Sequence, residues 1–228
     1  MISSSKILLA IDTSTRCIGL ALYDSAQVLH EAIWTSNDYH TVELAPAVAE
    51  AMRKSGITAQ NFGAIAVAIG PGSFTGLRIG LALAKGLSMV HQLPIIGIPT
   101  LDALAIAQPL LNIPMAAVLR AGRGRLAVSW YQVIEKRWES TGSIEICTPA
   151  EIVENIRAET YLCGELNKQE RELINSQKTS ILLASPARSL RRPAYLAEIA
   201  WERWMSGDVD DPASLTPTYL HYHDPIPG

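Results

Sequence analysis

Short runs of apolar residues alternate along this chain with segments in which apolar residues recur every three or four positions. A short continuous apolar run predicts a buried strand, and the longer spacing predicts an amphipathic helix. In the first half, strands are predicted at residues 6–11, 17–23, 27–35, 64–69 and 93–98, and helices at 41–54, 75–90 and about 100–109. Pro46 lies early in the first helix and predicts a kink or a late start there.

The second half begins near Pro114 and repeats this order of elements without a strict sequence repeat. Strands are predicted at 115–119, 126–133, 137–146, 161–163 and 181–183, and helices at 150–157 and 193–205. Because each half opens with a strand meander, we predict a duplicated α/β fold. We place an N-terminal subdomain at residues 1–110 and a C-terminal subdomain at 111–228, with a tail from Asp210 that crosses the surface.

The segment from Gly70 to Gly86 reads GPGSFTGLRIGLALAKG, a glycine-rich turn followed by a helix that Ser73 or Thr75 can cap. It has neither the ending of a P-loop nor the glycine spacing of a dinucleotide-binding turn. Small residues recur at Gly76, Gly80, Ala84 and Ser88, with Ala82 and Gly86 beside them. Because each glycine inside a helix costs about 1 kcal/mol relative to alanine, we interpret them as a contact surface for another helix. Packing on the chain's own sheet is the alternative.

Composition narrows the possible functions. The 228 residues carry a net charge of −3, which disfavours tight RNA binding by this chain alone. Two groups of arginines could touch phosphate, although solvated surface positions are favoured: Arg120, Arg123 and Arg125, and Arg188, Arg191 and Arg192. The three cysteines have no metal-binding spacing, and no signal peptide or membrane span is evident, so we expect a cytoplasmic protein without membrane contact.

Four segments together resemble the TsaB (YeaZ) family, whose older description is glycoprotease-like. They are ILLAIDTST at 7–15, GPGSFTGLRIGLALAKGLS at 70–88, IPTLDALA at 98–105 and PTYL at 217–220. The resemblance implies an actin/Hsp70/sugar-kinase-like (ASKHA) fold of two α/β subdomains. It also implies a role in making threonylcarbamoyladenosine at adenosine 37 of tRNAs that read ANN codons.

The resemblance further implies a non-catalytic partner subunit. The related subunit TsaD transfers the threonylcarbamoyl group, an ATPase called TsaE joins the complex, and this chain forms a heterodimer with TsaD or a homodimer in isolation. ATP and a metal ion are expected on the partner subunits, no cofactor is expected on this chain, and tRNA is expected to be met only through the complex. The expected partner interface comprises His40, Leu44, Val48, Gly76, Arg78, Gly80, Leu83, Ala84 and Leu87.

Several positions depart from catalytic relatives. The His-x-x-x-His metal pair of TsaD corresponds to Thr100 and Leu104, which are not useful ligands there. The second acidic hairpin of related kinases corresponds to residues 120–124, where Arg120 stands in place of an aspartate. These differences argue against the alternative functions, a small ATP-binding phosphotransferase or ATPase of the same superfold and a metalloprotease.

The remaining candidate residues have two interpretations each. Asp12, Thr13 and Ser14 could form a phosphate-binding turn, but a turn held by side-chain to backbone hydrogen bonds is favoured, so we regard it as vestigial. His40 has no histidine four residues later and is expected to cap its helix or lie on the surface. His221 and His223 are more readily a chance pair than a metal site.

Overall fold

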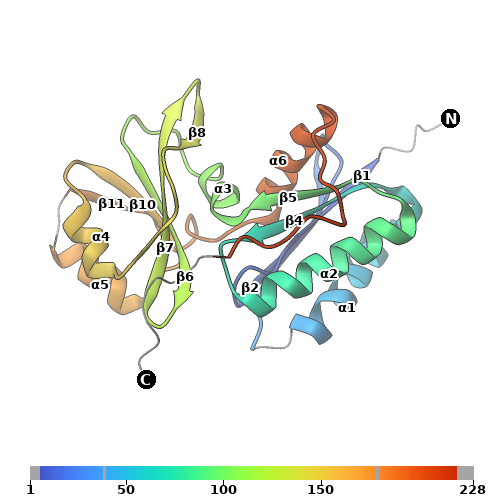
Figure 1. The fold of residues 1–228 in the computed structure, drawn as a ribbon, viewed down its shortest axis with the longest axis horizontal. Helices are drawn as coiled ribbons and strands as arrows, with labels where there is room; N and C mark the ends of the chain where they lie inside the picture. Colours follow the sequence, from blue (N-terminus) through green and yellow to red (C-terminus); the bar gives the residue numbers. More distant parts are fainter. Residues whose placement is uncertain (1–5, 38–39, 178–179, 220–228) are drawn as a thin grey trace.

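The computed structural model describes residues 6–37, 40–177 and 180–219, and it contains two β-sheets side by side (Figure 1). The first sheet has the strand order β3-β2-β1-β4-β5. β1, β2 and β3 pair antiparallel, and β4 and β5 extend the sheet in parallel from β1. The strands are β1 (Ile7–Asp12), β2 (Cys17–Tyr23), β3 (Val28–Thr35), β4 (Phe62–Gly70) and β5 (Ile95–Pro99).

The second sheet repeats this topology. Its order is β8-β7-β6-β10-β11, with antiparallel pairs on one side of β6 and parallel pairs on the other. The strands are β6 (Met115–Gly122), β7 (Arg125–Ile134), β8 (Arg137–Ser140), β10 (Thr160–Gly164) and β11 (Ile181–Leu183), and β9 (Glu145–Cys147) pairs with β7. The identical order and pairing confirm the predicted duplicated fold.

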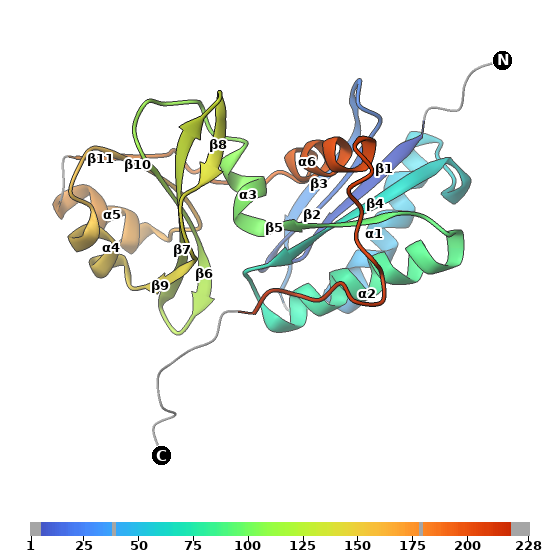
Figure 2. The same cartoon turned by 45° about the horizontal axis from the view of Figure 1, so that its top comes forward.

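Two helices cover one face of each sheet (Figure 2). α1 (His40–Ser55) and α2 (Phe74–His91) cover the first sheet, and α4 (Pro149–Asn155) and α5 (Lys168–Gln177) cover the second. Alternation along β1 explains the layering, because successive side chains of a strand point to opposite faces. Leu9 and Ile11 pack in the core with α1 and α2, whereas Leu8 and Ala10 pack in the core on the other face.

The last helix of each half packs against the sheet of the other half. α3 (Thr100–Ala105) packs Leu101 and Leu104 into a core with β6 and β10 of the second sheet. α6 (Pro193–Met205) packs Leu196, Ala197 and Ala200 against the first sheet. The chain then continues over the first sheet and along α2, where Thr218 N donates to Ile69 O at 2.7 Å (Figures 1 and 2). Part of the range 111–228 therefore packs on the first sheet.

Several predicted boundaries are wrong. α3 ends at Ala105 and is preceded by Pro99, with no side-chain cap from Thr100 or Asp102. The predicted strand 137–146 divides into β8 and β9, and β6 continues into the expected turn at residues 120–122. α5 was not predicted because its sequence, KQERELINSQ, is mostly polar. α1 begins at His40 and runs through Pro46. Of the two predicted effects of Pro46, a kink or a late start, the late start is wrong.

None of the described helices is long and apolar enough to cross a membrane.

The packing of α6 predicts that Leu196→Ala destabilises the first sheet. Leu196 is buried with Leu8 and Ile96, so truncation should lower the free energy of unfolding by about 2–5 kcal/mol. Met205→Ala, at the exposed end of the same helix, should change it by less than about 0.5 kcal/mol. Urea unfolding of both variants makes the comparison, and equal midpoints would contradict the assigned packing.

Candidate functional site

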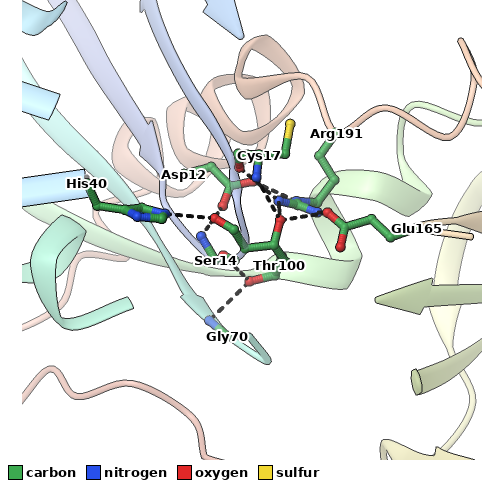
Figure 3. A network of polar contacts seen from close by, with 9 residues as sticks. Asp12, Ser14, Cys17, His40, Gly70, Thr100, Glu165 and Arg191 are labelled. Atoms are coloured by element: carbon green, nitrogen blue, oxygen red, sulfur yellow. Dashed lines mark hydrogen bonds and ion pairs between the residues drawn. The ribbon is translucent and has the colours of Figure 1, made fainter. Parts of the chain in front are cut away.

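The turn after β1 is buried at the junction of the two sheets. Its Asp12 Oδ1 accepts a hydrogen bond from Ser14 N at 2.8 Å. Ser14 Oγ lies 2.8 Å from Thr100 Oγ1, which also accepts from Gly70 N at 3.2 Å (Figure 3). Thr13 Oγ1 donates to Gly76 O at 2.7 Å. Hydrogen bonds from this turn therefore reach the end of β4 and the first residues of α2 and α3.

Arg191, in the loop before α6, fills the space beside this turn (Figure 3). Its Nε donates to Asp12 Oδ2 at 2.8 Å, its Nη2 donates to Thr15 Oγ1 at 2.8 Å, and its Nη1 donates to Glu165 Oε1. The Arg191 side chain is only 2% exposed. Burial alone would lower the pKa of this guanidinium, but the Asp12 and Glu165 carboxylates raise it above its ordinary value.

This arrangement does not fit the nucleotide phosphate or bound metal that the fold family implies at such a turn. One Asp12 oxygen accepts from Ser14 N and the other from Arg191 Nε. The guanidinium therefore stands where a diffusible cation would have to bind the carboxylate. The geometry agrees with a turn held by its own hydrogen bonds. Arg191 is neither solvated nor available to phosphate, which corrects both earlier interpretations of this residue.

A cleft of about 1350 Å³ opens next to the buried turn. Its wall comes from both halves and includes Thr15, Ser73, Phe74, Arg120, Glu165 and Tyr219. Arg120 forms a bidentate ion pair with Glu170, at 2.7 and 2.6 Å. Arg123 is exposed in the hairpin between β6 and β7. The charge of Arg120 is thus balanced by Glu170 within the chain.

The small residues of α2 form two faces with different surroundings. Gly76, Gly80, Ala84 and Ser88 are all buried. A Cβ on Gly76 would overlap Thr13 O, and one on Gly80 would overlap Thr13 Oγ1. These glycines permit a close approach, but the approaching group is the chain's own turn. This corrects the prediction that Gly76 and Gly80 form a partner surface.

The other predicted interface residues divide between core and surface. His40, Leu44 and Val48 are buried, and His40 Nε2 donates to Thr15 O at 2.9 Å, so His40 is not a surface residue. Leu83 and Leu87 are half-buried against the core between the first sheet and its two helices.

Arg78, by contrast, is exposed. Its Cζ atom lies 3.8 Å from the centroid of the Phe74 ring, and its Nε donates to Tyr219 Oη at 2.9 Å. Leu104 is buried in the core, and His221 and His223 lie outside the described residues.

The outward face of α1 and α2 carries exposed apolar and small residues instead. Val42, Met89 and Val90 are 64%, 71% and 76% exposed. The small residues exposed beside them are Ala45, Ala49, Ala82 and Gly86. A Cβ on Gly86 would meet nothing within 4 Å, so no contact within the described chain explains a glycine there. We call these residues the outer α1–α2 face.

Sequence reasoning did not find Glu165 or the pairing role of Arg191. Glu165 follows β10 and lies far along the chain from both Asp12 and Thr15. Arg191 is one of several arginines near the start of α6, and no local pattern distinguishes it from Arg192. Only the topology, which brings the ends of β1 and β10 together, reveals the cluster.

Comparison with known proteins gives consistent matches. Residues 27–184 match the family model described as "TsaD: tRNA N6-adenosine threonylcarbamoyltransferase". The chain is 28% identical over 223 residues to the "tRNA threonylcarbamoyladenosine biosynthesis protein TsaB" of Bacillus subtilis (strain 168), covering 93% of each chain. It is 38% identical over 98 residues to the Escherichia coli (strain K12) protein of the same name, covering 43% of this chain and 42% of that protein.

A solved structure shows the same fold. It is described as "YeaZ from Pseudomonas aeruginosa", with a TM-score of 0.77 and 23% sequence identity, and the alignment covers 94% of this chain and 100% of that one.

The two faces of α2 predict opposite effects of one substitution. Gly80→Ala should lower the free energy of unfolding by about 1–3 kcal/mol, because the new methyl group overlaps buried Thr13. Gly86→Ala should raise it by up to about 1 kcal/mol, because the position is helical and unobstructed. Denaturant unfolding of both variants is the measurement. A stabilised Gly80→Ala would show that the turn does not pack on α2 as described.

Proposed function

The chain belongs to the TsaB (YeaZ) family, which acts in tRNA threonylcarbamoyladenosine biosynthesis, and from this premise we propose that it is a non-catalytic partner subunit of TsaD. In this proposal the chain forms a heterodimer with TsaD, TsaE joins the pair, and tRNA is bound only by the complex. Heterodimer formation supports the active conformation of TsaD. ATP and the metal ion belong to the partner subunits.

The outer α1–α2 face is the observation that carries this proposal. Met89 and Val90 are largely exposed on a helix whose opposite side is well packed. Gly86 weakens the helix, and a Cβ atom added there would meet nothing within 4 Å in the described chain. An exposed apolar patch with small residues allows the backbone of a second helix to approach closely. A pair of TsaD helices would bury this patch, and a second copy of the chain could bury it in a homodimer, so the two assemblies compete.

The chemistry near the cleft supports a role without catalysis. Asp12 is bonded to Arg191 and Arg120 to Glu170, so two charges expected to face a ligand are bonded within the chain. The resemblance matches Thr100 and Leu104 to the metal pair of TsaD, and Thr100 uses its hydroxyl to hold the buried turn. These contacts favour a structural use of the residues.

One observation favours a second candidate, a small ATP-binding phosphotransferase or ATPase. The cleft of about 1350 Å³ is large enough for a nucleotide, and residues from both halves line it. Steady ATP turnover by the purified chain alone would support this candidate. A threonylcarbamoyl-transfer assay with TsaD and TsaE from the same organism, with and without the chain, tests the subunit role directly.

The proposed interface predicts that Ala82→Arg disrupts pairing with TsaD. Ala82 is exposed on the outer α1–α2 face, so the change should leave the monomer folded. A charged side chain buried without a partner costs several kcal/mol, so we expect TsaD binding to weaken about a hundredfold or more. Co-purification and sedimentation with TsaD measure the loss.

The matched control is Ala158→Arg, at an exposed position before β10 in the second half. It introduces the same charge away from the proposed interface and should bind TsaD like the unmodified chain. Unchanged TsaD binding by Ala82→Arg would overturn the interface. Equal loss in both variants would point to a general effect of charge.

A further inference from the structure

Arg191 joins three distant parts of the chain. Asp12 ends β1, the central strand of the first sheet, and Thr15 lies in the turn that follows. Glu165 directly follows β10 in the second sheet, and Arg191 lies between β11 and α6. Arg191 Nη2 also donates to Cys17 O at 3.2 Å, and Thr15 Oγ1 donates to Glu165 Oε1 at 2.6 Å. These polar groups therefore meet around a single guanidinium.

The oxygen atoms around Arg191 are of the kinds that bind cations in proteins. Two carboxylates and a hydroxyl surround one monovalent cation, which leaves a formal charge of −1. Oxygen donors of this kind are the ligands that hard divalent cations prefer. The neighbouring pair of Arg192 and Glu31 differs, because the Arg192 side chain is 47% exposed. Such a surface ion pair contributes little to the stability of the fold.

We infer that Asp12, Thr15 and Glu165 form a cation-binding site whose ligand is the chain's own Arg191. The covalently attached cation cannot dissociate, so it holds the ends of β1 and β10 together without a metal or nucleotide. The relative position of the two sheets then does not depend on a diffusible ligand. This inference goes beyond the proposed subunit role and needs no partner for its test.

The site predicts that Arg191→Ala binds a divalent cation. Removing the guanidinium leaves both carboxylates and space between them, so the variant should bind one Mn²⁺ at least tenfold more tightly than the unmodified chain. Titration followed by the electron paramagnetic resonance of free Mn²⁺ measures this. Mn²⁺ should also raise the lowered thermal midpoint of the variant. Arg192→Ala is the control, and Arg191→Ala with Asp12→Asn should lose the added affinity.

A neutral replacement covers the case in which Arg191→Ala does not fold. Breaking a buried ion pair is strongly destabilising, whereas replacing all of its charges by groups of similar shape is often tolerated. The triple variant Asp12→Asn, Glu165→Gln, Arg191→Met should therefore have a thermal midpoint well above that of Arg191→Ala and should gain no Mn²⁺ affinity. Arg191→Ala with unchanged Mn²⁺ affinity, or a triple variant as unstable as the single one, would overturn the inference.

Discussion

The buried guanidinium of Arg191 is the constraint on which the junction of the two sheets depends. A charge this deeply buried is tolerated only when its donors are satisfied, and here Asp12, Thr15 and Glu165 accept from it. Because Asp12 and Thr15 lie at the end of β1 and in the turn after it, and Glu165 follows β10 of the other sheet, the hydrogen bonds act between the halves as well as within them. The buried turn also holds α2, since Thr13 packs against its glycines and Ser14 O accepts from Ser73 N. The turn after β1 therefore lies beside the cleft and also holds the buried side of α2 in place.

α2 packs in the core on one side and exposes apolar and small residues on the other. Its inner residues are small because the buried turn occupies the space that larger side chains would need. Its outer residues are small without any such neighbour in the described chain, Gly86 most clearly. A spacing of four places Gly76 and Gly80 on one side, and Ala82 and Gly86 on another. The glycines on the two sides are therefore explained differently. Contact with the chain's own buried turn explains those on the inner side, and contact with a partner helix is proposed for the one on the outer side.

Much of the fold could be predicted from local patterns, and little of the site could. The predicted bounds of β2, β11 and α6 agree with the structure, because apolar runs and helical spacing are properties of adjacent residues. α5 escaped prediction because few of its residues are apolar. Periodicity places Gly80 and Ala84 on one face but cannot identify what packs there. The pairing of Asp12 with Arg191 joins residues far apart in the chain, so only the assembled topology could reveal it.

The duplicated fold gives the two halves corresponding charged residues at the ends of their central strands. β1 and β6 hold the same place in their sheets, and each carries a charged residue among its last three residues. The first sheet supplies Asp12, which is bonded to Arg191, and the second supplies Arg120, which is bonded to Glu170. The two ends thus carry opposite charges, and each is balanced by a partner within the chain. Both ion pairs are therefore internal to the chain, which agrees with the proposed role as a partner subunit.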